Sequence, residues 1–233
     1  MSNKSSQVVY AAGVLSGVAV SLICIYGFPN ISYSLRMTWI DYMTRQDPSL
    51  LCNDLETLCG ENGAVVSFEN QVTPNQIDRS KHLNNSNYVY ELNFSRRHFF
   101  NSLGLWRVLK SLDSNMVVQC QTIRYRRELK VWQKYRIHTR IIELDETEDC
   151  FYLESRFLMD DNFVAAIHHV KYKIVGPKGK DGLRVKISPV KVLQDAGVLL
   201  ETPKHPVTVR PDGFIFLWEK GNKFSSKQLF QRQ

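Results

Sequence analysis

The sequence of 233 residues predicts an α+β domain in which one long helix packs against an antiparallel sheet. Apolar residues recur at helical spacing between Tyr88 and Leu109, one strand-like segment precedes this stretch, and four such segments follow it. The later segments alternate between apolar and polar residues, which is typical of antiparallel strands with one face in water. We therefore expect the helix to cover the apolar face of the sheet.

The helix is expected to begin after a polar, turn-rich stretch at 73–87. Tyr88, Leu92 and Phe99 share one helical face, and the residues Asn85–Asn87 are candidate N-caps. Gly104 is expected to end or interrupt the helix.

The strands are bounded by turn signals. The segment Asp160–Asn162 predicts a hairpin turn between the last two strands. His168 and His169 resemble a metal-ligand pair, but neighbours on a strand point to opposite faces and so do not bind one ion together. The strands are expected at 64–72, 116–125, 132–144, 150–159 and 163–175.

An apolar segment from Val8 to Gly27 contains no charged residue. About 20 apolar residues suffice for a membrane-spanning helix, and the end of this segment is a poor cleavage site, so we expect an uncleaved signal anchor. A cleaved signal peptide, giving a secreted protein, is the alternative.

Two potential glycosylation sites, at Asn84 and Asn93, lie inside the motif described below. A glycan there would block a working site. We therefore expect the domain to face the cytosol from a membrane, most simply that of the endoplasmic reticulum.

The expected organisation has four parts. These are an N-terminal membrane anchor at 1–30, a connector at 31–63, the α+β domain at 64–176, and an irregular C-terminal extension at 177–233. The extension contains a short helix candidate, Val190–Val198, and an aromatic patch, Phe214–Trp218, to which the sequence assigns no function.

Composition limits the classes of partner. The net charge of +7 favours anionic partners, but the basic residues are scattered and form no nucleic-acid motif, so no nucleic acid is expected. The five cysteines have no metal-site or CxxC spacing, so they are expected to be ordinary thiols. No metal and no cofactor are expected.

The informative motif runs from Asp78 to Tyr88. It places a carboxylate in a turn just before the long helix, whose first N–H groups are unpaired and carry partial positive charge. Such a helix end polarises a carbonyl or holds an oxyanion. Asp78 is suited to attack a thioester or to activate water, and His82 is the nearest titratable neighbour. Asn84 and Asn85 are suited to cap the helix or to donate to a substrate carbonyl.

This motif resembles that of the hot-dog thioesterases related to 4-hydroxybenzoyl-CoA thioesterase, and most closely the branch called thioesterase superfamily member six. The resemblance covers residues 64–175 and implies a hot-dog fold, in which an antiparallel sheet wraps one long helix. It implies an acyl-CoA or related thioester as ligand and a homodimer with a shared site. The residues that it assigns are Asp78, His82 and Asn85 as catalytic and Asn84, Tyr88 and Arg96 as substrate-binding.

Three departures from the family pattern concern catalysis. Lys81 replaces a glycine, Gln76 replaces a frequent aspartate, and Asn93 replaces an acidic residue, so that a second carboxylate is missing near the site. Arg96 is suited to pair with a carboxylate on a strand or to lie on a solvated helix face. Two functions follow: an acyl-CoA thioesterase that uses Asp78, or a non-catalytic, membrane-tethered hot-dog module that binds acyl chains or protein partners.

Overall fold

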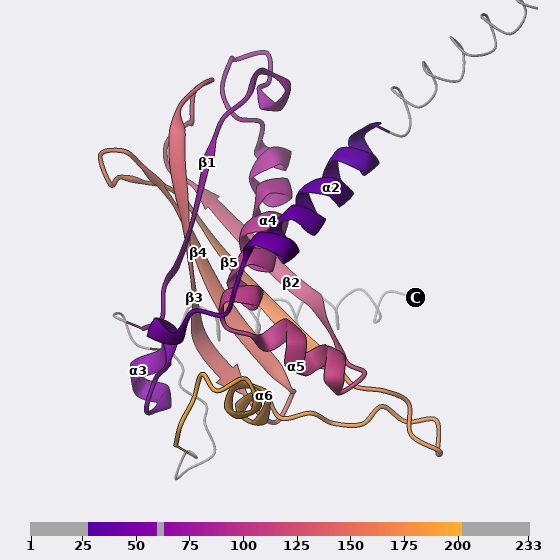
Figure 1. Cartoon of the computed structure of the whole chain (residues 1–233). Coiled ribbons are helices and arrows are strands. Elements are labelled where there is room, and N and C mark those ends of the chain that lie inside the picture. The colour runs from indigo at the N-terminus through magenta and orange to yellow at the C-terminus, as the bar shows by residue number, and fades with distance from the viewer. Residues whose placement is uncertain (1–27, 60–62, 202–233) are drawn as a thin grey trace, which may run out of the picture. The chain divides into compact units, whose positions relative to one another are not determined.

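The computed structural model describes residues 28–59 and 63–201 (Figure 1). Its contacts divide the chain into two units after Met43, and the described part of the first unit is the helix α2 (Phe28–Met43). None of the described helices is long and apolar enough to span a membrane. The anchor predicted at Val8–Gly27 lies outside the described residues.

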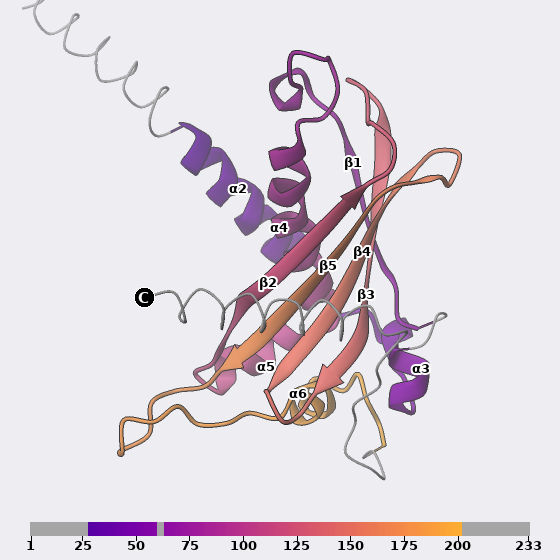
Figure 2. The same ribbon diagram turned by 180° about the vertical axis from the view of Figure 1, so that it is seen from behind.

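The second unit contains a five-stranded sheet with the order β1-β3-β4-β5-β2, in which each neighbouring pair is antiparallel. The helices α4 and α5 lie on one face (Figure 1), and the strands are seen from the other face in Figure 2. The predicted hot-dog arrangement is confirmed. The strands are β1 (Val66–Gln71), β2 (Asn115–Tyr125), β3 (Lys134–Asp145), β4 (Cys150–Met159) and β5 (Val164–Val175).

The long helix is divided at Gly104, as predicted. This residue has φ 70° and separates α4 (Asn85–Ser102) from α5 (Leu105–Ser111), because a glycine adopts a left-handed conformation without steric cost. The helix α4 begins earlier than predicted, and its N-cap is Asn84, one of the capping residues expected from the motif. The shorter elements are η2 (Pro48–Leu50), α3 (Leu55–Cys59), η3 (Pro74–Gln76) and α6 (Pro189–Asp195).

The core between α4 and the sheet is divided into two apolar clusters. The smaller cluster surrounds Tyr88 and Leu92, near the start of α4. The larger cluster surrounds Phe99 near the end of α4 and also takes in Val192 and Leu193 of α6. The apolar core therefore extends beyond residue 176, the expected end of the α+β domain.

The opposite face of the sheet is charged. His168 and His169 point to different faces, as predicted: His168 is fully buried beneath α4, whereas His169 lies 3.3 Å from Glu154 on the charged face. Arg140 and Arg156 also contact the Glu154 carboxylate, at 3.0 and 2.9 Å. Burial alone would raise the pKa of Glu154, but the hydrogen bond with His169 and the two arginines lower it to about 2.

Candidate functional site

Residues 76–84 form a small hairpin immediately before α4. The Asn84 N–H donates to the Gln76 carbonyl at 2.9 Å, and the Asp78 N–H donates to the His82 carbonyl at 3.0 Å. A further bond, from the Leu83 N–H to the Leu129 carbonyl at 2.7 Å, holds the hairpin against the loop that follows β2. The backbone therefore brings Asp78 and His82 together at the tip of the hairpin, as the motif required.

Both oxygens of the Asp78 carboxylate have neighbours within the hairpin. Oδ1 accepts the Ser80 N–H at 2.8 Å, and Oδ2 lies 3.3 Å from His82 Nδ1. The other ring nitrogen of His82, Nε2, lies 3.7 Å from Glu128. The side chains of Asp78 and His82 are 32% and 30% exposed, so solvent reaches both. The imidazole is thus placed to orient the carboxylate while one side of the pair remains open.

Lys81 shows how the turn tolerates the loss of a glycine. Its φ is 64°, in the left-handed region that glycine adopts freely, and its N–H donates to the Asp78 carbonyl at 3.1 Å. The turn therefore keeps the backbone conformation that favours glycine, at the cost of some strain in Lys81. The departure at this position does not remove the hairpin.

Two asparagines at the start of α4 differ in their side-chain contacts: Asn84 is hydrogen-bonded as the N-cap, whereas Asn85 is exposed. Asn84 caps the helix, since its Oδ1 accepts the Ser86 N–H at 3.0 Å. Asn85 is exposed, and in the described part of the chain its side-chain amide makes no hydrogen bond. The Tyr125 hydroxyl donates to the Asn85 carbonyl at 3.1 Å, which ties the end of β2 to the helix start. Asn85 is thus the residue whose amide is available to a ligand.

The two remaining residues of the motif are buried. Tyr88 is 2% exposed, and its ring packs edge-on against Tyr125 and Phe157, with centroids 5.1 and 5.0 Å away; burial raises the pKa of its hydroxyl to about 12. Arg96 is 4% exposed, so the interpretation that it lies on a solvated helix face is wrong. Its guanidinium donates to Asn93 at 2.6 Å and to Gln121 at 3.4 Å.

A second carboxylate, which was not predicted from the sequence, lies next to the hairpin. Glu91 is fully buried on α4 and accepts hydrogen bonds from Asn70 at 2.5 Å and from Gln76 at 2.6 Å. It therefore fixes the first residue of the hairpin, two positions before Asp78. The signal was present in the sequence, because Glu91 shares the helical face of Tyr88 and Ser95, where a charged residue requires buried partners.

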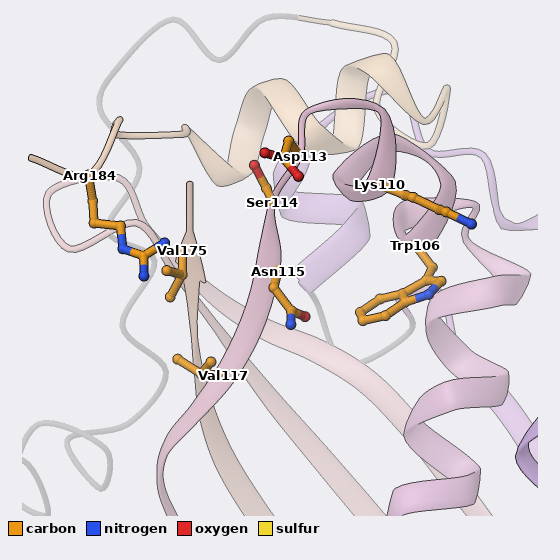
Figure 3. Close-up of a pocket in the computed structure, with 8 residues that line it drawn as sticks. All are labelled: Trp106, Lys110, Asp113, Ser114, Asn115, Val117, Val175 and Arg184. Carbon is orange, nitrogen blue, oxygen red and sulfur yellow. The ribbon is translucent and has the colours of Figure 1, made fainter. Parts of the chain in front are cut away.

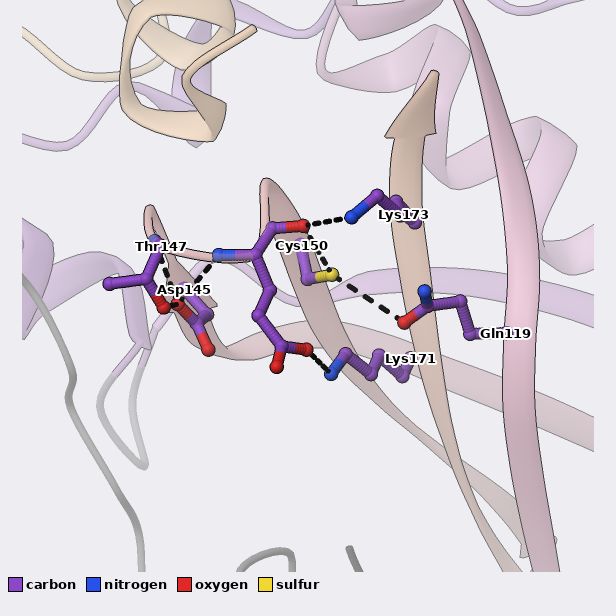
Figure 4. Close-up of polar contacts among 7 residues, drawn as sticks. Gln119, Asp145, Thr147, Cys150, Lys171 and Lys173 are labelled. Carbon is purple, nitrogen blue, oxygen red and sulfur yellow. Dashed lines mark hydrogen bonds and ion pairs between the residues drawn. The ribbon is translucent and has the colours of Figure 1, made fainter. Parts of the chain in front are cut away.

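Two of the described cysteines, Cys59 and Cys150, are buried thiols. Burial raises the pKa of Cys59 and of Cys150 to about 12, so neither is a thiolate at neutral pH. Cys150 lies in a polar cluster at one end of the charged face, where Lys171 forms an ion pair with Glu148 (Figure 4). Within residues 28–59 and 63–201 no three His, Cys, Asp or Glu side chains are grouped to hold a metal.

Two cavities lie near the ends of β2. One, of about 570 Å³, is lined by Glu128, Trp132 and neighbouring residues, and so adjoins the carboxylate that faces His82. The other, of about 560 Å³, lies at the start of β2, where Figure 3 shows Trp106 and Arg184 on opposite sides of the strand. The second cavity contains none of the predicted site residues.

A family model described as the thioesterase-like superfamily matches residues 72–191, which include the hairpin, α4 and all of β2 to β5. The chain belongs to the thioesterase-like superfamily. Among its relatives in this superfamily are Protein THEM6 of Xenopus laevis, 35% identical over 165 residues, and Protein THEM6 of Danio rerio, 34% identical over 154 residues. These alignments cover 70% and 66% of this chain and 71% of each relative. The resemblance seen in the sequence motif is confirmed.

Solved structures of other proteins are also similar to the chain. The probable thioesterase YbaW from Escherichia coli is 16% identical, with a TM-score of 0.49 over 57% of this chain and 98% of that one. A Staphylococcus aureus protein solved in complex with CoA is 15% identical, with a TM-score of 0.49 over 64% of this chain and 93% of that one.

Proposed function

We propose that the protein hydrolyses acyl-CoA thioesters and that Asp78 is its working carboxylate. The observation that carries the proposal is the hairpin tip, where Asp78 lies 3.3 Å from His82, just before the amino end of α4. A partly exposed carboxylate beside an imidazole and a helix N-terminus supplies the groups that thioester hydrolysis needs.

The chemistry has two routes. As a general base, Asp78 takes a proton from water, the resulting hydroxide attacks the thioester carbonyl carbon, and the carbon–sulfur bond breaks to give a carboxylic acid and a thiol. As a nucleophile, Asp78 attacks the carbonyl itself, releases the thiolate and forms an anhydride that water then hydrolyses. In both routes His82 holds Asp78 in place, because its ring bridges the carboxylates of Asp78 and Glu128.

The oxyanion formed in either route needs hydrogen-bond donors. The amino end of α4 carries partial positive charge, and the Asn85 amide is exposed beside it, so Asn85 is proposed as the side-chain donor. Asn84 and Tyr88 contribute indirectly: Asn84 fixes the start of the helix, and Tyr88 anchors its first turn in the core.

The site is proposed to work in a homodimer. The strand β2 is a long edge of the sheet, and Val117 and Val118 on it are 43% and 42% exposed. An exposed edge with apolar side chains favours pairing with another strand. Pairing of two β2 strands would bring residues of a second copy close to Tyr125, whose hydroxyl contacts the start of α4.

One observation favours the alternative, a binding module without catalysis. Both oxygens of the Asp78 carboxylate are already engaged, by Ser80 and His82, as in an aspartate that only stabilises a turn. In this alternative the apolar core and the helix start still bind an acyl thioester, but no bond is broken.

A panel of acyl-CoA thioesters of different chain length distinguishes the two functions. The full chain in detergent is incubated with each thioester, free thiol is measured, and binding of a non-hydrolysable ketone analogue is measured in parallel. We expect release of thiol from at least one thioester. Binding of the analogue without release of thiol would instead support the binding module.

A further inference from the structure

A layer of polar side chains separates the two apolar clusters of the core. On α4, β3, β4 and β5 the layer residue is flanked by apolar residues of the two clusters, for example Ile137 and Ile141 on β3. Strand register places the β3, β4 and β5 members of the layer at one level, since Thr139 pairs with Ser155 and Ser155 pairs with His168, whereas Gln121 of β2 pairs with Val170 and reaches His168 through its side chain. The layer consists of Ser95 and Arg96 of α4, Thr139 of β3, Ser155 of β4, His168 of β5 and Gln121 of β2.

One half of the layer satisfies itself. The Ser95 and Thr139 hydroxyls lie 3.2 Å apart, and the Thr139 and Ser155 hydroxyls lie 3.0 Å apart. Hydroxyl groups donate and accept, so this chain of three meets its own requirements inside the core. This half has a structural role.

The other half leaves a hydrogen-bond acceptor unmet. Gln121 Oε1 lies 3.4 Å from Arg96 Nη1 and 3.1 Å from His168 Nε2. An arginine can only donate, so the atom of the Gln121 amide that faces Arg96 must be the oxygen. His168 must then donate from Nε2, which leaves Nδ1 as a bare acceptor.

His168 stays neutral in this position. Burial, together with the charges of Arg96 and His169, lowers its pKa to about 3. Nδ1 is buried and has no hydrogen-bond partner in the described structure. A buried acceptor without a donor is destabilising, so binding of a suitable donor at this point is favoured.

We infer that Nδ1 of His168 accepts a hydrogen bond from the bound thioester and so helps to select the ligand. The inference rests on the proposed function. The ligand group must be an O–H or N–H donor, and an acyl-CoA offers two sources: a hydroxyl on the acyl group, or an amide N–H of the pantetheine arm. Gln121 is exposed and lies on the edge strand β2, so the layer reaches the surface at this edge of the sheet.

The test uses binding of ketone analogues, so that it does not depend on turnover. Pairs of analogues differ by one hydroxyl, placed at successive positions of the acyl chain. If the acyl group supplies the donor, the full-length protein should bind one hydroxylated analogue roughly 3- to 30-fold more tightly than its partner. If the pantetheine arm supplies it, no pair should differ, but loss of the acceptor should weaken all analogues alike.

Two variants separate the nitrogens of His168. The variant His168→Asn keeps a polar atom near the Nδ1 position, and His168→Gln keeps one near the Nε2 position. We expect His168→Asn to retain the affinity of wild type for the analogues. We expect His168→Gln to lower that affinity by the same 3- to 30-fold, for one hydroxylated analogue if the acyl group is the donor and for all analogues if the pantetheine arm is. Ser155→Ala is the control, because it removes a hydroxyl from the self-satisfied half of the layer only.

A spectroscopic measurement keeps the inference testable if the variants do not fold. In wild-type protein labelled with ¹⁵N at histidine, the Nδ1 resonance of His168 should be that of a bare acceptor without ligand and should shift when an analogue binds. An Nδ1 already hydrogen-bonded without ligand, or analogue binding that leaves it unchanged, would overturn the inference alone. Failure to bind any analogue would remove the proposed function and the inference with it.

Discussion

The strained turn at Lys81 leads to a prediction about stability. Lys81 has φ 64°, whereas its neighbour Ser80 is not among the residues with positive φ. Both lie in the hairpin tip, and both are exposed. Replacing each with glycine in turn therefore separates the relief of strain from the added freedom of the unfolded chain.

The magnitude follows from two opposing contributions. A left-handed conformation costs a non-glycine residue about 1–2 kcal/mol, and Lys81→Gly removes this cost. A new glycine also stabilises the unfolded state by about 0.4–1 kcal/mol. The net gain in the free energy of unfolding is about 0.5–1 kcal/mol, which raises the melting temperature by about 1–4 °C for a unit of this size.

Thermal unfolding of the full chain in detergent, followed by tryptophan fluorescence, provides the assay. Ser80→Gly is the matched control, and it should lower stability by about 0.4–1 kcal/mol because it relieves no strain. The Asp78 contact with the backbone N–H of residue 80 is available in both variants. If Lys81→Gly destabilises the protein as much as Ser80→Gly does, the backbone at Lys81 is not strained.

Three further predictions concern other regions. The pKa of Glu154 is lowered from 4.5 to about 2, so the ionised carboxylate stabilises the fold above pH 4.5 and this stabilisation is lost as the pH falls toward 2. In Glu154→Gln, the free energy of unfolding measured by urea titration should therefore depend less on pH between 4.5 and 2. Light scattering should show a dimer that Val118→Lys on β2 dissociates and Ser67→Lys on the β1 edge leaves intact; a monomeric wild type would contradict this. Extraction with alkaline carbonate should leave the chain in the membranes; its release into the supernatant would contradict the predicted anchor. Glycosidase should not change the gel mobility of the chain; a shift that Asn84→Gln abolishes would contradict the predicted orientation.

Much of the fold could be predicted from the sequence because its signals are local. The alternation of Tyr135, Ile137 and Ile141 identified β3, and Gly104 marked the break between α4 and α5. The motif placed Asp78 and His82 together because a short hairpin leaves them few other arrangements. In each of these cases the determining residues lie within one element or one turn.

Features that depend on distant residues were not predicted. Glu91 is satisfied by Asn70, on a strand 21 positions earlier, so the sequence gives no direct sign of that bond. Arg96 finds Gln121 only because α4 lies over the sheet. The polar layer likewise needs the strand order, which places β2 beside β5 rather than beside its neighbours in sequence. Tertiary pairing, rather than local propensity, decides these features.

The central claim is that Asp78 acts in catalysis while Glu91 only supports the hairpin. The variants Asp78→Asn and Glu91→Gln each remove one charge and keep the size of the side chain. For any thioester that the wild type hydrolyses, Asp78→Asn should lower turnover by roughly 10²–10⁴-fold and change stability by about 1 kcal/mol or less. Glu91→Gln should lower stability by about 1–3 kcal/mol, since a buried acceptor of two hydrogen bonds is altered.

The decisive measurement is thiol release per folded molecule at saturating thioester for wild type and both variants. We expect the rate to fall for Asp78→Asn and to stay within a few-fold of wild type for Glu91→Gln. Undiminished thiol release by Asp78→Asn would show that Asp78 has no catalytic role.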